Sequence, residues 1–247
     1  MPCHAGAVGG GAGWAPLVLV HSPLVGPATC RPLAQELRRR GRRTVLPSLP
    51  GAPAAGAPVW RRQVDAVVSA VAREAAGEPL VLAAHSGAGP LLHLLDAALP
   101  AEVLGWVLVD AGLPGPGGSW VRTAPPALVE HLRSLVVDGW LPPWHEWFGG
   151  EEALAPDVPD AALRAALLAE LRPLPWAALT EDRPSGQDRP GPPGAYLQLS
   201  GGYAQEAALA AARGWPVRVL DSHHLGLATD PAAVAGALLQ LVDLLDR

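Results

Sequence analysis

Hydrophobic residues follow two alternating patterns along most of this chain. Short apolar runs indicate buried strands, and between them apolar residues recur at the spacing of amphipathic helices. The predicted strands are residues 17–20, 44–46, the run from 80 up to Ser86, 103–109, 196–199 and 217–220. The predicted helices are 32–40, a helix with its apolar face over 60–71, 91–99, 204–213 and a last helix that begins with Asp230 and Pro231. This order predicts an α/β fold: a mostly parallel, doubly wound sheet with helices on both faces.

The interval 111–193 interrupts this alternation. It holds amphipathic helical patterns over 126–137 and 160–171, and a connector rich in Pro and Gly over 183–194. Five of the nine tryptophans fall here: Trp120, Trp140, Trp144, Trp147 and Trp176. We therefore expect a core made of 1–110 and 194–247, with 111–193 inserted as a helical cap. The cap is expected over the carboxyl edge of the strands, where open parallel sheets bind ligands.

One serine stands at the most informative position of the chain. The run 80–84 ends at His85-Ser86-Gly87, with Ala84 and Ala88 on either side and an apolar helix directly after. Small neighbours permit a sharp turn from strand to helix, and the helix N-terminus then directs free N–H groups toward charge that develops beside Ser86. Ser86 is the candidate nucleophile. The alternative is an ordinary turn serine in a chain rich in Ala and Gly.

A serine nucleophile needs a base to take its proton and an acid to orient that base. His223 and His224 follow the last predicted strand, on the same edge of the sheet as Ser86. Asp110 ends the strand 103–109 on that edge. The order of nucleophile, acid and base along the chain is one that α/β-hydrolases use.

With these features, the sequence resembles the α/β-hydrolase superfamily over nearly its whole length. His21-Ser22-Pro23-Leu24 is similar to the oxyanion loop, residues 84–88 to the Gly-x-Ser-x-Gly elbow, 107–114 to the end of strand six, and 224–231 to the catalytic-histidine segment. The spacing between histidine and proline in the last segment selects His224 over His223. The resemblance implies a triad of Ser86, His224 and Asp110.

The sequence departs from the family pattern at the oxyanion loop. Pro23 stands where the family supplies a backbone N–H, and proline has none. The partner of the Gly87 N–H in an oxyanion hole is then the Leu24 N–H, the Ser22 hydroxyl or nothing. We assign Gly87 and Leu24 as the expected donors. Two of the elbow glycines are also replaced, by Ala84 and Ala88, and a single methyl group still permits close packing.

The acid is also displaced from its usual place in the family, after strand seven. Residues 199–203 pass through that place without a carboxylate, and the next one is Glu206. Some family members carry the acid after strand six, where Asp110 stands. Asp110 is therefore the expected acid, with Glu206 as the alternative and Asp221 as an outer contact of the site.

The remaining histidines carry weaker expectations. His21 is expected to brace the oxyanion loop by hydrogen bonding, and His85 to point away from Ser86 and pack. His93 is expected in the core or an interface, whereas His131 and His145 belong to the cap and could reach a pocket. The spacing of His and carboxylates matches no metal motif, so neither a metal nor another cofactor is expected.

Two cap tryptophans are candidate pocket residues. Trp120 follows the Pro/Gly-rich loop after Asp110, and Trp144 belongs to the aromatic segment Trp144-His145-Glu146-Trp147. Tryptophans more often fill a core than bind a ligand. Aromatic walls in a cap would nevertheless suit an apolar acyl group and exclude water during the reaction.

Composition narrows the class of partner. The net charge is −5 and all 18 basic residues are arginine, so a nucleic-acid surface is not expected. The two cysteines, Cys3 and Cys30, cannot form a disulfide framework, and a reducing cytoplasm is the expectation. Neither a membrane span nor a signal peptide is recognised. A small-molecule substrate is the expected partner, and the sequence leaves both a monomer and a homodimer open.

Together these features predict a capped serine hydrolase that cleaves a carboxylic ester or thioester of a small to mid-sized apolar substrate through an acyl-enzyme. The alternative is a non-hydrolytic protein of the same fold, either a biosynthetic cyclase or lyase or a ligand-binding accessory module. Epoxide or haloalkane hydrolysis is disfavoured, because those relatives need a carboxylate where this chain has Ser86.

Overall fold

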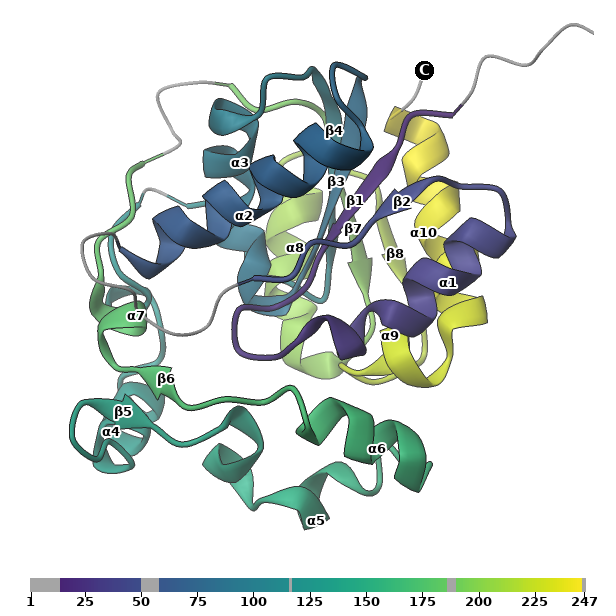
Figure 1. The fold of residues 1–247 in the computed structure, drawn as a ribbon. Helices are drawn as coiled ribbons and strands as arrows, with labels where there is room; N and C mark the ends of the chain where they lie inside the picture. The colour runs from purple at the N-terminus through teal and green to yellow at the C-terminus, as the bar shows by residue number, and fades with distance from the viewer. Residues whose placement is uncertain (1–13, 50–57, 116, 186–189, 246–247) are drawn as a thin grey trace, which may run out of the picture.

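The computed structural model describes residues 14–49, 58–115, 117–185 and 190–245. Six parallel strands form one sheet in the spatial order β2, β1, β3, β4, β7, β8 (Figure 1). The strands are β1 (Leu17–Val20), β2 (Thr44–Val45), β3 (Leu80–His85), β4 (Val103–Val109), β7 (Gly194–Gln198) and β8 (Val217–Val219). All their carboxyl ends therefore lie at one edge of the sheet.

Helices cover both faces of this sheet, and the pattern of side chains in the strands shows why. Val18 and Val20 of β1 belong to one apolar cluster, whereas Leu17 and Leu19 belong to another, because successive strand residues point to opposite faces. The first cluster lies beneath α2 (Val59–Glu74), α3 (Leu92–Ala98) and α8 (Ala204–Ala212). The second lies beneath α1 (Arg31–Arg39) and α10 (Pro231–Leu245). The predicted doubly wound α/β fold is confirmed.

The helix expected over 91–99 is confirmed as α3 (Leu92–Ala98), and the 3₁₀ helix η2 (Ser86–Leu91) precedes it. Pro90 lies inside η2 and has no N–H to donate. In α2, the buried face includes Val59 and Gln63, whereas Trp60 and Val68 are only partly buried. The start of α10 is as expected, because the Asp230 side chain accepts a hydrogen bond from Ala233 N at 3.1 Å.

The chain leaves the sheet after β4 and returns at β7, and the cap elements lie between. These are η3 (Trp120–Arg122), α4 (Pro126–Ser134), β5 (Trp140–Leu141), η4 (Trp144–Phe148), α5 (Glu151–Leu154), α6 (Ala161–Leu168), β6 (Leu174–Pro175) and α7 (Ala177–Thr180). Strands β5 and β6 pair antiparallel. In Figure 1 the cap, teal to green, extends past one end of the sheet. Both α4 and α6 are shorter than the patterns that predicted them.

Apolar packing and hydrogen bonds attach the cap to the core. Val158 and Leu167 of the cap share an apolar cluster with Ala28 and Leu225 of the core. The Glu170 carboxylate accepts hydrogen bonds from Ala28 N and, at 2.7 Å, from the Arg31 guanidinium. A second carboxylate, that of Glu181, accepts from Val59 N at the start of α2. The cap is thus fastened to α1 and α2 at separate points.

None of the helices in the described part of the chain combines the length and apolar character that a membrane span requires. Cys30 is buried without exposure, and burial raises the pKa of its thiol to about 12. Its thiol is therefore protonated and unreactive near neutral pH. Cys3 lies outside the described residues.

Candidate active site

Ser86 stands at the sharp turn between β3 and η2. Its backbone φ is +57°, a left-handed conformation that a non-glycine residue seldom adopts. The turn is tight because the chain after it passes against the segment after β4: a side chain at Gly89 would collide with the Gly112 backbone. Gly112 N also donates to the Ser86 carbonyl at 3.2 Å. Close packing of small residues therefore holds the serine in this strained position.

The three expected triad residues meet at the carboxyl edge of the sheet. His224 Nε2 lies 3.1 Å from Ser86 Oγ, and His224 Nδ1 lies 3.0 Å from Asp110 Oδ2. If Nδ1 carries the proton donated to Asp110, Nε2 is the acceptor for the Ser86 hydroxyl. The three side chains form one chain of hydrogen bonds, although they are far apart in the sequence.

Asp110 is fully buried and held by four hydrogen bonds. It follows β4 with φ of +44°, and its carboxylate accepts from Leu199 N, Ser200 N and the Ser200 hydroxyl at 2.7, 3.0 and 2.6 Å, besides His224. Burial acts to raise the pKa of this carboxyl, but the hydrogen bonds from His224, Ser200 and Leu199 outweigh it and lower the pKa. Asp110 therefore remains an anion that can orient the imidazole.

The alternatives to this triad lie elsewhere. In the described part of the chain, no hydrogen bond joins Glu206 or Asp221 to His224, and Asp221 is exposed. His223 is directed away from Ser86: its Nε2 lies 2.9 Å from the Thr229 hydroxyl, and its Nδ1 accepts from Leu225 N. The geometry thus favours Asp110 and His224 among the candidates.

Sequence reasoning missed Tyr203, which follows β7. Its hydroxyl lies 3.3 Å from Ser86 Oγ, and its ring stacks on the imidazole of His224 with centroids 5.0 Å apart and 6° between the planes. Burial is the largest cause that raises the pKa of the Tyr203 phenol, so the group keeps its proton. Since the Ser86 proton points to His224, the Tyr203 O–H is free to donate to Ser86 Oγ. The only signal in the sequence was an aromatic residue in the turn after a strand.

His85 is packed as expected, but it also contacts the base. Its Nε2 donates to the His224 carbonyl at 3.0 Å, and the two rings are 4.6 Å apart. Burial, with a smaller contribution from the neighbouring His224 ring, lowers the pKa of His85 to about 3. His85 is therefore neutral at physiological pH and holds the backbone of the residue that acts on Ser86.

His21 braces the oxyanion loop, as predicted. Its Nε2 accepts from Leu49 N at 3.1 Å, so its Nδ1 carries the proton and donates to the Ser22 carbonyl at 2.8 Å. Burial is the main cause that lowers the pKa of His21, which favours this neutral form. The ring fixes the loop segment in which the unusual Pro23 lies.

The oxyanion loop differs in detail from the expectation. The Leu24 N–H, the expected second donor, instead donates to Ser22 Oγ at 3.3 Å, because the loop turns back on itself at Pro23. A Cβ built on Gly87 would lie 3.3 Å from that same oxygen and 3.5 Å from Pro23. The Ser22 hydroxyl therefore lies against the backbone of Gly87, and its own proton is free for another acceptor.

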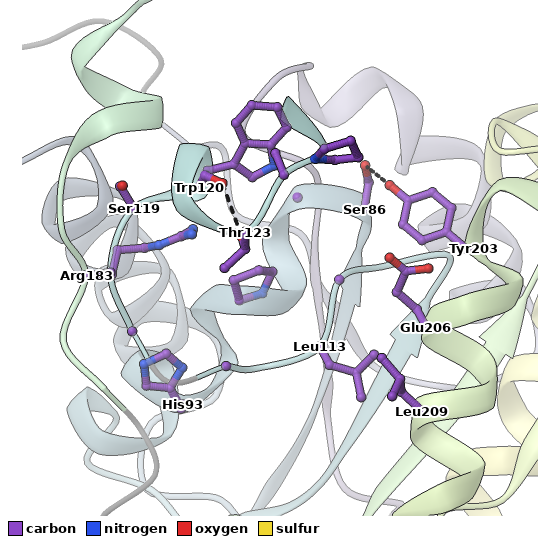
Figure 2. A pocket seen from close by; sticks show the side chains of 18 residues that line it. Ser86, His93, Leu113, Ser119, Trp120, Thr123, Arg183, Tyr203, Glu206 and Leu209 are labelled. Atoms are coloured by element: carbon purple, nitrogen blue, oxygen red, sulfur yellow. Dashed lines mark hydrogen bonds between the residues drawn. The ribbon is translucent and has the colours of Figure 1, made fainter. Parts of the chain in front are cut away.

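A cavity of about 370 Å³ opens beside Ser86, between the sheet edge and the start of the cap (Figure 2). Trp120, Tyr203, Glu206 and Arg183 are among the residues that line it. A smaller cavity of about 70 Å³ lies on the other side of Trp120 and Gly87, with mainly apolar walls that include Leu24 and Trp147. Ser86 thus faces a space of the size that small-molecule sites have.

The two candidate pocket tryptophans have different places. Trp120 lines both cavities, as expected. Trp144 lines neither of them; it packs against two apolar clusters, one of which joins the cap to Ala28 and Leu225 of the core, since the turn of η4 directs Trp147 toward the smaller cavity instead. Trp144 as a pocket residue is therefore not supported, and Trp147 takes that place.

The remaining histidines also have defined contacts. His93, expected in the core or an interface, lines the larger cavity from α3, and its Nε2 lies 2.9 Å from the Pro184 carbonyl. His131 Nε2 donates to the Trp147 carbonyl within the cap, and His145 Nε2 lies 4.0 Å from Glu146 Oε1. Neither of these two lines the cavities beside Ser86.

No protein-family model matches the chain, and no curated protein matches its sequence. Solved structures do match it. An extracellular α/β-hydrolase from a Paenibacillus species, described as sharing structural and functional homology with tobacco salicylic acid binding protein 2, has a TM-score of 0.74 at 17% identity, over 92% of this chain and 98% of that chain.

Two further structures show the breadth of proteins with this arrangement. A thermophilic esterase from Thermogutta terrifontis has a TM-score of 0.65 at 18% identity, over 94% of this chain and 91% of its own. A variant of tomato methylketone synthase I has a TM-score of 0.67 at 14% identity, over 94% and 98%. The likeness covers more than nine-tenths of the chain in each case, and the chain has the α/β-hydrolase fold that its sequence resemblance predicts.

Proposed function

We propose that this protein is a serine hydrolase that cleaves a carboxylic ester or thioester of a small to mid-sized substrate. The observation that carries the proposal is the unbroken hydrogen-bond chain from Ser86 through His224 to the buried Asp110, beside a cavity. Such a chain can deprotonate a hydroxyl and return the proton to a leaving group. The fold shared with an esterase and an α/β-hydrolase supports the same reaction class.

In the proposed mechanism, Ser86 Oγ attacks the scissile carbonyl as His224 Nε2 takes its proton. Asp110 stabilises the imidazolium that forms and keeps its Nδ1–H in place. His224 then donates the proton to the departing alcohol or thiol. A water molecule, deprotonated by His224 in turn, attacks the acyl-enzyme and releases the acid and free Ser86.

The negative oxygen of the tetrahedral intermediate needs donors that are already in position. The Gly87 N–H is the first, since it directly follows the nucleophile. We assign the Ser22 hydroxyl as the second, because it accepts from Leu24 N and lies against Gly87 with its proton unused. The unusual Pro23 then removes an N–H from the loop without removing the second donor.

The apolar walls of the smaller cavity favour a substrate whose groups next to the scissile ester are apolar. Leu24, Trp120 and Trp147 border the smaller cavity, which is connected to the oxyanion loop through Gly87. Apolar walls exclude water around the developing charge and accept an acyl chain or a ring.

A second candidate is a non-hydrolytic reaction on the same fold, and one contact favours it. The Tyr203 hydroxyl lies within hydrogen-bond distance of Ser86 Oγ, so Ser86 could act with Tyr203 as a hydrogen-bond donor to a bound ligand, with His224 as the base. Methylketone synthase I shows that a protein described as a synthase can have this architecture.

Covalent labelling distinguishes the two candidates. A fluorophosphonate probe should label the intact protein and leave Ser86→Ala unlabelled. Mass spectrometry after rapid acid quench of a p-nitrophenyl ester reaction should show the acyl group on the peptide that contains Ser86. Labelling that persists in Ser86→Ala, or ester turnover without an acylated Ser86, would contradict the proposed mechanism.

A further inference from the structure

A single arginine of the cap points into the active-site cavity. Arg183 lines both the larger cavity beside Ser86 and the smaller apolar one, and Figure 2 shows its guanidinium directed toward Thr123 and Trp120. Ser86 and Tyr203 lie on the opposite side of the same view. The cavity therefore has a nucleophile at one side and a cation at the other.

The backbone holds Arg183 in this place from two directions. Gly118 N donates to the Arg183 carbonyl at 2.8 Å, and Arg183 N donates to the Gly118 carbonyl at 3.2 Å. His93 Nε2 donates to the carbonyl of the next residue, Pro184, at 2.9 Å. Gly117, with φ of +86°, allows this close approach, since a side chain there would strike the backbone of residues 183–185. These contacts fix Arg183 where residues 117–122 and 182–184 run side by side, a segment pair that we call the cap neck.

The guanidinium has no anionic partner in the described part of the chain. The nearby Arg122 is paired with Asp182, at 3.7 Å, whereas no ion pair or side-chain hydrogen bond joins the Arg183 guanidinium to another described residue. The one carboxylate that lines the larger cavity, Glu206, lies across it beside Tyr203 (Figure 2). Burial is the sole cause acting on the pKa of Arg183, and it lowers that pKa while the group stays cationic. A half-buried cation without a partner is costly unless an anion joins it.

We propose that Arg183 binds a carboxylate of the substrate, so that this protein prefers esters or thioesters that carry a carboxylate away from the scissile carbonyl. The inference rests on the proposed hydrolase function and defines its substrate class. The planar guanidinium accepts a carboxylate through two parallel hydrogen bonds. Glu206 repels the same group from the Ser86 side, so the charged end is directed to Arg183 and the neutral ester to Ser86.

Pairs of esters, one with a carboxylate and one neutral, test this proposal. The first pair is methyl hydrogen glutarate and the neutral methyl 5-methylhexanoate, with the charge on the acyl part. The second pair is 3-(butanoyloxy)benzoate and phenyl butanoate, with the charge on the leaving group. In at least one pair, the intact protein should have a kcat/KM about 10- to 100-fold higher for the anionic ester, as expected for hydrogen bonds between charged groups.

Arg183→Gln should abolish that preference by lowering kcat/KM for the anionic ester far more than for the neutral ester, and Arg183→Lys should restore part of it. Arg122→Gln removes an exposed arginine of the same cap neck and is the matched control, which should keep the preference. Thermal unfolding of all variants verifies that each is folded. Equal preference in the intact protein and Arg183→Gln, in both pairs, would overturn the assignment of Arg183.

A binding measurement separates this inference from the proposed function. Methyl hydrogen glutarate should bind Ser86→Ala in calorimetry. The double variant Ser86→Ala with Arg183→Gln should bind the same ester at least about tenfold more weakly. Arg183-dependent binding without ester turnover would support the anion site and contradict the hydrolase. Ester turnover in which Arg183→Gln leaves the ratio of kcat/KM for anionic over neutral esters unchanged in both pairs would support the hydrolase and overturn the anion site.

Discussion

The phenol ring of Tyr203 lies flat against the imidazole of His224, with 6° between the ring planes, and its hydroxyl reaches Ser86 Oγ at 3.3 Å. One side chain therefore touches both the nucleophile and the base of the proposed triad. The stack limits the tilt of the imidazole, while the hydroxyl fixes the rotamer of Ser86. Tyr203 occupies the turn after β7, where the resemblance places the family's usual acid, so a positioning residue replaces the carboxylate there.

Tyr203→Phe keeps the stack and removes only the hydroxyl. We expect kcat for an activated ester to fall about 2- to 10-fold, the usual worth of one hydrogen bond, with little change in KM. Tyr203→Ala should lower kcat further, because the imidazole then loses its stacking partner. Steady-state kinetics of the two variants measures the difference. Equal kcat in Tyr203→Phe and Tyr203→Ala would show that the ring does not position His224.

Asp110→Asn tests which carboxylate orients His224. The amide cannot stabilise an imidazolium and favours the wrong tautomer, so kcat should fall about 10³- to 10⁴-fold. Glu206→Gln should have a far smaller effect, since no hydrogen bond joins Glu206 to His224 in the described residues. Both substitutions keep the size of the side chain. A larger loss of kcat in Glu206→Gln than in Asp110→Asn would show that Glu206, not Asp110, orients His224.

The fold and the three candidate triad residues could be predicted from the sequence because they depend on strand ends. Ser86, Asp110 and His224 each come directly after or near the end of a strand, and parallel strands bring those ends to one edge. The burial of β1 on both faces is also visible in the sequence as an unbroken apolar run, since each face packs against different helices.

The rest of the site depends on how loops turn, which apolar patterns do not specify. Whether Leu24 N–H faces the substrate or Ser22 depends on the bend at Pro23. Whether Trp144 or Trp147 faces the cavity depends on the turn of a short 3₁₀ helix. Arg183 is 97 residues from Ser86 in the sequence (183 − 86), and only the path of the cap brings it into the cavity.

Ser22→Ala tests the second oxyanion donor. Loss of one such donor costs about 2.7–4 kcal/mol of transition-state stabilisation, so kcat should fall about 10²- to 10³-fold while KM stays similar. The matched variant Ser48→Ala removes another serine hydroxyl, which lines a cavity on the far side of the loop, and it should retain its activity. If Ser22→Ala also retains kcat, the Leu24 N–H would have to turn toward the oxyanion when substrate binds.

His85 should make the fold sensitive to acid. Its pKa is about 3 in the folded protein, and that of an unfolded histidine is about 6.5. Between these values the unfolded chain binds a proton that the folded protein does not, so the free energy of unfolding decreases as the pH falls from 6.5 to 3. The loss approaches about 1.4 kcal/mol for each pH unit.

Urea unfolding at pH 7, 5.5 and 4.5 measures this dependence. His85→Gln retains a side-chain N–H for the His224 carbonyl and does not titrate, so its stability should decrease less between pH 7 and 4.5 than that of the intact protein. The same pH dependence in both proteins would mean that other groups cause the acid sensitivity.

Glu170 makes two polar contacts between the cap and the core. Its carboxylate accepts from Ala28 N and from the partly exposed Arg31, in the segment that follows the oxyanion loop. In Glu170→Gln, the charge-assisted bonds weaken, and because both side chains are partly in solvent the global stability should decrease by only about 1 kcal/mol or less. Local opening of the cap should increase instead, since residues 161–175 lose their fixed point on α1.

Hydrogen exchange measured by mass spectrometry should therefore show faster exchange over 161–175 in Glu170→Gln, with unchanged exchange in β3 and β4. Glu152→Gln, an exposed substitution on α5 of the same cap, is the control and should exchange like the intact protein. Faster exchange of the cap should accompany a higher KM, because the substrate must first order a looser cap. Uniformly faster exchange in cap and sheet alike would show that Glu170 supports the whole fold rather than the attachment of the cap.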